Sequence, residues 1–218
     1  MRFYEYKAKE IFRKYGIPTP QGVVVKDAKH IPDVPLPCAI KAQVLIGGRG
    51  KAGGIKFADT MEEVKQRVNE IMGMDIRGYR VTNVLIEEKL EIAKELYLGY
   101  IIDRSNRSIT MLATAEGGME VEEVPEEKLL KIRINPLIGL QPYMLRTLVR
   151  FLGVENEVAK QVKTIATKLW QLFIGEDADL VEINPLVITA DGKVVAGDAK
   201  LTIDDDALYR HPEYLSIT

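Results

Sequence analysis

Apolar side chains recur every three or four residues in two segments of the chain, the spacing that places them on one face of an α-helix. These segments are residues 3–15 and about 155–173. Gly16 and Pro18 follow the first segment as helix stop signals. A further helix is predicted from Thr60 to about Met72, because Thr-Met-Glu-Glu at its start forms a capping box.

Short apolar runs bounded by glycine, proline or polar residues predict β-strands elsewhere. The expected strands are residues 22–25, 38–44, 81–90, 95–103, 108–115, 180–189 and 193–203. Residues 31–37 hold three prolines and are expected to form an irregular connector. Helices and strands alternate without strict βαβ order, which predicts an α+β fold with mostly antiparallel sheets.

Composition narrows the class of protein. The 218 residues are 46% apolar, enough for the core of one large domain or of two smaller lobes. A net charge of −2 and 7% aromatic residues argue against a nucleic-acid binder. The single cysteine, Cys38, rules out an internal disulfide. The N-terminus is charged and resembles no secretory signal, and no apolar run is long enough to cross a membrane, so we expect a cytoplasmic protein.

The strand predicted at 38–44 runs into the loop Gly-Gly-Arg-Gly-Lys-Ala-Gly-Gly, residues 47–54. Such a loop can turn several backbone N–H groups toward one anion, because glycine accepts positive φ and lets a phosphate approach the main chain. Lys41, on the preceding strand, can reach the same phosphates. The loop lacks the Lys-Ser/Thr ending of a Walker A motif, and no βαβ unit surrounds its G-x-G-x-x-G match. The residues alone leave open a phosphate site and a solvated flexible turn.

A second group of polar residues lies on the hairpin predicted near the C-terminus. Glu182 and Asn184 share one face of the first strand, and Asp198 lies on the return strand. A two-residue turn would pair residue 185 with 198, whereas a three-residue loop at 190–192 pairs 184 with 198. Glycine at the third loop position, Gly192, suits the three-residue loop.

With the three-residue loop, the hairpin gathers oxygen ligands on one face, which suits Mg²⁺. Lys200 is available there as a neutralising partner for the carboxylates. An ordinary hairpin with a polar outer face remains the other interpretation.

Four long segments, taken together and in this order, resemble one family. They are KAQVLIGGRGKAGGIK (41–56), IAKELYLG (92–99), TAEGGMEVEEV (114–124) and LVEINPLVITADGKVVAGDAK (180–200). The family is the beta subunit of succinyl-CoA synthetase, the ADP-forming succinate–CoA ligase, in its nucleotide-binding part. The resemblance covers essentially the whole chain and implies an ATP-grasp fold, with residues 21–90 as a small lobe and residues 1–20 plus 91–218 as a large lobe that carries the Mg²⁺ site.

The resemblance also implies roles for individual residues of the small lobe and its link. Lys41 and the backbone of Gly48, Arg49 and Gly50 would hold the phosphates of ATP or ADP. Glu87 and Leu90, on the linking strand, would meet the adenine.

In the large lobe, Glu95 would accept hydrogen bonds from the ribose hydroxyls. Asn184 and Asp198 would bind Mg²⁺. Glu182 would lie near the transferred phosphoryl group and is the catalytic candidate.

Two departures from the family pattern affect this interpretation. The family often has histidine where Leu45 stands in the glycine loop. The sequence also ends at Thr218, and we expect it to lack the C-terminal domain of the usual beta subunit, either as a truncated form or as a naturally split subunit. In the family, the phosphate passes to a histidine of an alpha subunit, so that subunit is the expected partner. His30 and His211 lie in no glycine-rich or acidic motif, and both are expected to be solvent-exposed.

Three hypotheses follow for the function. The first is the ATP-grasp part of a succinate–CoA ligase, which is inactive without the alpha subunit and the C-terminal domain. The second is the same part of a malate– or citrate–CoA ligase. The third is a nucleotide-binding assembly module without catalysis of its own.

Overall fold

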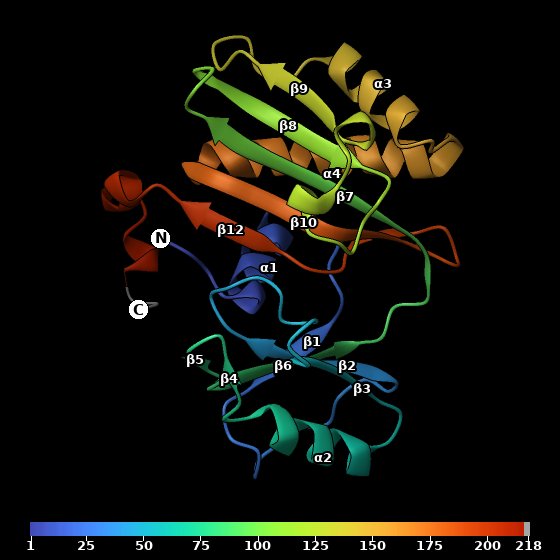
Figure 1. Cartoon of the computed structure of the whole chain (residues 1–218), viewed down its shortest axis with the longest axis vertical. Coiled ribbons are helices and arrows are strands. Elements are labelled where there is room, and N and C mark those ends of the chain that lie inside the picture. The colour runs from blue at the N-terminus through green and yellow to red at the C-terminus, as the bar shows by residue number, and fades with distance from the viewer. Residues whose placement is uncertain (216–218) are drawn as a thin grey trace. The chain divides into compact units, whose positions relative to one another are not determined.

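Backbone contacts divide the chain into two units, Pro20–Glu91 and Met1–Thr19 together with Ile92–Thr218. The computed structural model (Figure 1) describes residues 1–215. Every strand pair in the described residues is antiparallel. The predicted α+β class with antiparallel sheets is therefore confirmed.

The Pro20–Glu91 unit is built on a four-stranded sheet in the order β1-β6-β2-β3. The strands are β1 (Gly22–Val25), β2 (Cys38–Gln43), β3 (Ile55–Ala58) and β6 (Asn83–Glu88). A small hairpin, β4 (Asp75–Ile76) and β5 (Tyr79–Arg80), and one helix, α2 (Met61–Ile71), complete the unit. Strand β3 and the small hairpin lie in segments for which the sequence pattern predicted no element.

Helix α2 packs on one face of this sheet (Figure 1). Val64 and Val68 of α2 are fully buried with Ile40 and Ile86 of the central strands. Because side chains alternate along a strand, the residues next to Ile40 and Ile86 point to the opposite face. That opposite face carries Lys41 and Glu87.

The capping box at the start of α2 forms with one variation. The Thr60 hydroxyl accepts a hydrogen bond from the Glu63 amide at 3.3 Å. The Glu63 carboxylate accepts from the amide of Asp59 at 2.7 Å, one residue before the cap. Both bonds satisfy amides at a helix start that have no partner within the helix.

The other unit is built on a six-stranded sheet in the order β11-β10-β7-β8-β9, with β12 also paired to β10. The strands are β7 (Ile92–Asp103), β8 (Ser108–Thr114), β9 (Leu130–Ile134), β10 (Ala178–Thr189), β11 (Val194–Ala196) and β12 (Lys200–Ile203). Its α-helices are α1 (Glu5–Lys14), α3 (Pro142–Phe151) and α4 (Asn156–Gly175). Short 3₁₀ turns occur at Val121–Glu123, Glu126–Lys128, Asp205–Arg210 and Pro212–Tyr214.

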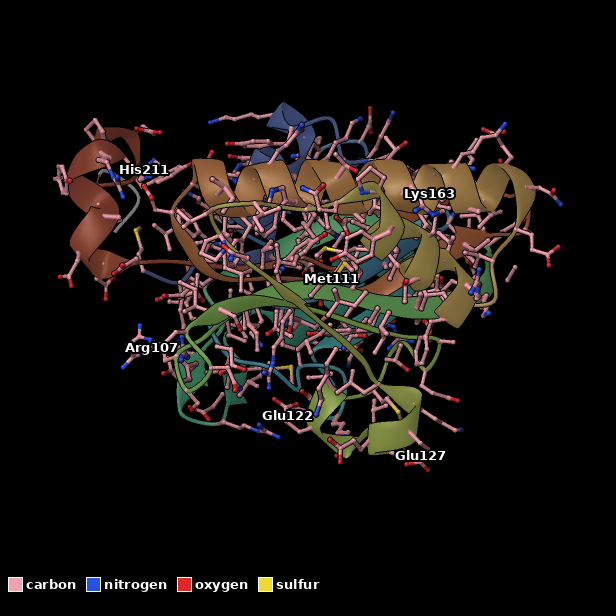
Figure 2. The ribbon with its side chains drawn as sticks, turned by 90° about the horizontal axis from the view of Figure 1, so that it is seen from above. Arg107, Met111, Glu122, Glu127, Lys163 and His211 are labelled. Carbon is pink, nitrogen blue, oxygen red and sulfur yellow. The ribbon has the colours of Figure 1, made fainter. Side chains whose placement is uncertain are left out.

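These helices pack on one face of the six-stranded sheet, where the main core lies. Figure 2 shows Lys163 on α4 and Met111 in the sheet beneath that helix, while Glu122 and Glu127 lie on the other side of the sheet. Leu96, Leu98 and Tyr100 point from β7 toward α4, and the Tyr100 hydroxyl donates to the Ala166 carbonyl of that helix at 2.9 Å. The alternate residues of β7 therefore face away from the helices.

His211 corrects one expectation from the sequence. It is 7% exposed, whereas His30 is exposed as predicted. Its Nε2 lies 2.9 Å from the Asp177 carboxylate and its ring stacks on Tyr214, whose hydroxyl donates to Glu176 at 2.6 Å. Tertiary hydrogen bonds at the end of α4, which the local sequence does not reveal, bury this histidine.

No helix in the described residues is both long and apolar enough to span a membrane.

The cap of α2 generates a stability prediction. Thr60→Ala removes the acceptor of the Glu63 amide and should lower the free energy of unfolding by about 1 kcal/mol, measured by urea denaturation. Thr147→Ala is the matched control, because its hydroxyl only bonds back to the Tyr143 carbonyl inside α3. That control should be neutral or slightly stabilising. Equal losses in both variants would contradict the capping role.

Candidate functional site

Lys41 and Glu87 form an ion pair on the face of the four-stranded sheet that points away from α2. The Lys41 ammonium lies 2.9 Å from the Glu87 carboxylate, and their side chains are 12% and 2% exposed. The register explains the contact, because Ala39 pairs with Glu87 and Lys41 is two residues further along β2 on the same face. The structure thus brings together the lysine assigned to phosphate and the glutamate assigned to adenine.

The glycine loop at 47–54 folds back onto β2 through backbone hydrogen bonds. The Gly54 amide donates to the Arg49 carbonyl at 2.8 Å, and the Ala42 amide donates to the Gly54 carbonyl at 2.7 Å. The Arg49 guanidinium is turned inward and donates to the Ala42 carbonyl at 3.0 Å. The Arg49 side chain therefore has a structural role in shaping the loop.

Two amides of this loop remain available for a ligand. Within residues 1–215, the N–H groups of Gly48 and Gly50 donate no hydrogen bond, although both carbonyls accept one. Gly48 has φ of 78°, a conformation that glycine adopts without strain. The loop therefore has the donors of an anion-binding nest.

Arg77 is a cation beside this loop that sequence reasoning missed. It occupies the tip of the β4–β5 hairpin with φ of 52°. Its guanidinium atoms lie 3.0–3.4 Å from the point where a Cβ on Gly48 would be, so only glycine leaves room for this contact. In the described part of the chain its guanidinium has no ion-pair partner. A lone exposed arginine carries no signal in one sequence, because only the tertiary fold places it against Gly48.

Leu90, which the sequence pattern placed at the end of the strand 81–90, lies outside the observed strand. β6 ends at Glu88, and Leu90 follows it half-buried in the link that leads to β7. The ladder ends there because Lys89 donates its amide to the Pro37 carbonyl at 3.0 Å, outside β2.

Glu182 is held by two side chains on the face of the six-stranded sheet that points away from α4. The Tyr97 hydroxyl donates to one carboxylate oxygen at 3.1 Å, and the Lys200 ammonium donates to the other at 3.0 Å. Lys200 lies directly opposite Glu182 in the β10–β12 ladder. Gly99, also opposite Glu182, leaves room for Tyr97, since a Cβ there would be 3.0 Å from the tyrosine hydroxyl.

Burial and the neighbouring Glu182 charge raise the pKa of Tyr97 well above its ordinary value. Ionising this tyrosine would place a second negative charge beside the carboxylate in a site with little water. Tyr97 therefore stays a neutral hydrogen-bond donor to Glu182 at physiological pH. Sequence reasoning did not single out Tyr97, although it lies within the IAKELYLG segment.

The loop after β8 connects Glu95 with Asn184. The Gly118 amide donates to Asn184 Oδ1 at 2.9 Å, and Asn184 Nδ2 donates to the Met119 carbonyl at 2.8 Å. The Gly117 amide donates to the Glu95 carbonyl at 3.2 Å. The double glycine is required, because a Cβ on Gly117 would lie 2.6 Å from the Glu95 and Leu96 backbone and one on Gly118 would lie 2.5 Å from the Glu95 carboxylate.

The three-residue hairpin loop predicted from Gly192 is confirmed by the β10–β11 register. Ile188 pairs with Val194, and the same register continues in β12, where Glu182 pairs with Lys200. In this register residue 184 stands opposite residue 198. The predicted return strand is interrupted around Asp198, because β11 ends at Ala196 and β12 begins at Lys200.

The donor set around Asn184 and Asp198 fits Mg²⁺. Asn184 offers an amide oxygen that accepts one hydrogen bond, from Gly118, and has a second lone pair. Asp198 offers a carboxylate whose Oδ1 accepts from the amide of Ala199 at 2.7 Å. Hard oxygen ligands with a single carboxylate are typical of sites where substrate phosphates and water complete the shell of this ion.

The candidate residues form two sets. Lys41, Glu87 and the glycine loop belong to the Pro20–Glu91 unit, with Leu90 in its final link. Glu95, Glu182, Asn184 and Asp198 belong to the other unit, where Tyr97, Lys200 and the Gly117–Gly118 loop support them.

Comparison with known proteins places this arrangement in a family. Residues 2–188 match the model of the ATP-grasp domain. The chain is 46% identical to the succinate–CoA ligase [ADP-forming] subunit beta of Methanothermobacter thermautotrophicus over 100% of this chain and 61% of the relative. It is 43% identical to the [GDP-forming] subunit beta of Thermus thermophilus over 98% of this chain and 58% of the relative. The chain thus spans about three-fifths of the length of these relatives.

Solved structures show the same fold at low sequence identity. ATP citrate lyase from Methanothrix soehngenii matches with a TM-score of 0.75 at 22% identity, over 99% of this chain and 54% of the other. A dinucleotide-forming acetyl-coenzyme A synthetase from Ca. Korarchaeum cryptofilum matches with a TM-score of 0.76 at 16% identity, over 93% of both chains.

The double-glycine loop generates a prediction. Gly117→Ala forces a methyl group into the Glu95 and Leu96 backbone, so it should lower the free energy of unfolding by about 2 kcal/mol or more in urea denaturation. Gly50→Ala is the control, since its methyl would meet only Ile55 Cδ1, at 3.8 Å, and should change stability by less than about 0.5 kcal/mol. Equal stability of the two variants would contradict the close packing of the loop.

Proposed function

The chain belongs to the ATP-grasp family, and from this premise we propose that it is the nucleotide-binding part of a succinate–CoA ligase beta subunit. The proposed overall reaction converts ATP, succinate and CoA to ADP, phosphate and succinyl-CoA. The observation that carries the proposal is that the candidate residues form two sets. The Pro20–Glu91 unit holds Lys41 and the amides of the glycine loop, which can donate to phosphate, and the other unit holds the oxygen ligands Asn184 and Asp198 together with Glu182. The identities of 43–46% to succinate–CoA ligase beta subunits over nearly all of this chain support it.

The phosphate-binding role rests on donors that exist before ligand arrives. The amides of Gly48 and Gly50 point from a loop that is already closed by its own hydrogen bonds. Lys41 and Arg77 add positive charge, and Glu87 holds Lys41 in place at 2.9 Å. We propose that a nucleotide phosphate takes over part of the Lys41 interaction, which leaves the Glu87 carboxylate to accept from the amino group of the base.

In the other unit, Asn184 and Asp198 would hold Mg²⁺, which would neutralise phosphate charge and orient the phosphoryl group. Glu95 would accept from the ribose hydroxyls, and the Gly117 amide holds its backbone carbonyl. Glu182, held by Tyr97 and Lys200, would lie near the transferred phosphoryl group and orient the histidine that accepts it. Because Tyr97 remains protonated, Glu182 keeps the same hydrogen bond across the physiological pH range.

The proposal extends to a partner and a location. In a succinate–CoA ligase the phosphate would pass to a histidine of an alpha subunit, so we propose a hetero-oligomer in the cytoplasm. The relatives include ADP-forming and GDP-forming enzymes. We propose ATP as the nucleotide because Pro20 resembles the ATP-preferring form of the family, and the bulk of Leu90 would help to shape the base pocket.

Phosphate transfer tests the proposed function. A fusion in which the remainder of a related beta subunit follows Thr218 is mixed with a cognate alpha subunit, Mg²⁺ and labelled ATP. A labelled phosphohistidine is expected, and its release as succinyl-CoA forms is expected with succinate rather than malate or citrate. Nucleotide binding without labelling would instead support an assembly module. Turnover with malate or citrate alone would support a related acid–CoA ligase.

A first prediction concerns the phosphate set. The double variant Lys41→Met/Glu87→Gln removes both buried charges and should weaken ATP binding by at least about tenfold, measured by calorimetry, because a charged hydrogen bond to phosphate is lost. Lys65→Met removes an exposed lysine of α2 and should leave the affinity unchanged. Unchanged ATP affinity in the folded double variant would refute the phosphate role of Lys41.

A second prediction concerns the metal set. Asp198→Asn should raise the Mg²⁺ concentration needed for half-maximal nucleotide binding by about tenfold, because a neutral amide binds the ion more weakly than a carboxylate. The control Asp191→Asn removes an exposed carboxylate from the same hairpin and should not shift that concentration. An identical Mg²⁺ dependence in Asp198→Asn and the unmodified chain would count against the site.

A further inference from the structure

Pro185 leaves a gap in the hydrogen bonding of the β10 hairpin next to Asp198. In the register of this hairpin residue 185 stands opposite residue 197, and the Gly197 amide donates to the Pro185 carbonyl at 3.0 Å. A hydrogen-bonded antiparallel pair normally exchanges two such bonds. Proline has no N–H, so it cannot return the bond, and the Gly197 carbonyl needs a donor from elsewhere.

Lys9 supplies that donor from helix α1. Its ammonium donates to the Gly197 carbonyl at 2.9 Å although 188 residues separate the two in sequence. Lys9 is paired one helical turn earlier with Glu5 at 2.8 Å, and the two side chains are 1% and 2% exposed. A buried charged pair is expensive to desolvate, and a hydrophobic pair would normally stabilise the helix as well or better. The pair therefore calls for an explanation beyond the stability of α1.

The same segment is fixed from two other directions. The Ala196 amide donates to the Pro18 carbonyl at 2.8 Å, just after α1. Gly197 has no space for a side chain, because a Cβ would lie 3.0 Å from Val187 and 3.1 Å from the Pro185 carbonyl. The backbone that leads into Asp198 is thus held by α1 on one side and by β10 on the other.

We propose that Lys9 is a positioning residue for the Mg²⁺ ligand Asp198 and that Glu5 neutralises the lysine. The inference rests on the proposed function of Asp198 as a metal ligand. The Lys9 ammonium fixes the carbonyl of the residue before Asp198, which sets the direction in which the Asp198 side chain leaves the backbone between β11 and β12. Glu5 is required because an uncompensated ammonium one residue away would repel a divalent cation.

The test uses the double variant Glu5→Leu/Lys9→Met, in which neither charge is left buried alone. ADP binding is measured by calorimetry in EDTA and at increasing Mg²⁺ concentration. The expected result is an unchanged affinity for ADP in EDTA and a rise of about tenfold in the Mg²⁺ concentration at half-saturation, as is typical when a group that orients a metal ligand is lost.

Two controls separate positioning from stability. Ile11→Val destabilises the same helix inside the core without touching Gly197 and should leave the Mg²⁺ dependence unchanged. If the double variant fails to fold, Lys9→Arg keeps the charge pair but replaces the ammonium with a broader planar group, and a smaller shift in the same direction is expected. An unchanged Mg²⁺ dependence in a folded Lys9 variant, or an equal shift in Ile11→Val, overturns the inference. The proposed metal site then stands or falls separately, because Asp198→Asn in the same assay tests it without Lys9.

Discussion

The alternation of side chains across a strand, with helices on one face of each sheet, is the constraint on which the rest of this structure depends. In the Pro20–Glu91 unit, α2 packs on the apolar residues of β2 and β6, so Lys41 and Glu87 lie on the opposite face of the sheet. In the other unit, α4 packs on Leu96 and Leu98, so Tyr97 and Glu182 lie on the opposite face. The same packing that forms the core thereby gathers the polar groups on one face of each sheet.

Lys41, Glu87, Glu182 and Asn184 on these faces are buried or half-buried, and each has a partner that holds it. Lys41 pairs with Glu87, Glu182 receives Tyr97 and Lys200, and Asn184 is bound at both ends of its amide by the loop at 117–119. Removing a charge from water is costly unless such partners exist. These pairings therefore serve folding and also hold the groups in place before any ligand binds, which lowers the entropic cost of binding.

Much of this could be predicted from local sequence, and the exceptions have physical reasons. The three-residue hairpin loop was predicted correctly from Gly192, because the residue preferences of a turn are local. That loop sets the register in which residue 184 stands opposite residue 198. Strands β3 and β9 were missed because runs of four and five residues carry little signal, although apolar and charged residues alternate in β9. Helix α3 was missed although the proline at its start is a signal for a helix N-terminus. The buried His211, Arg77 against Gly48 and Lys9 against Gly197 all depend on contacts between distant segments, which no local pattern encodes.

The central proposal is that this chain binds a nucleotide together with Mg²⁺. Calorimetric titration of the unmodified 218-residue chain with ADP, first in EDTA and then in excess Mg²⁺, tests it most directly. The account predicts one ADP per chain and tighter binding in Mg²⁺ than in EDTA. Absence of binding in both conditions, or an affinity that does not respond to Mg²⁺, would contradict it.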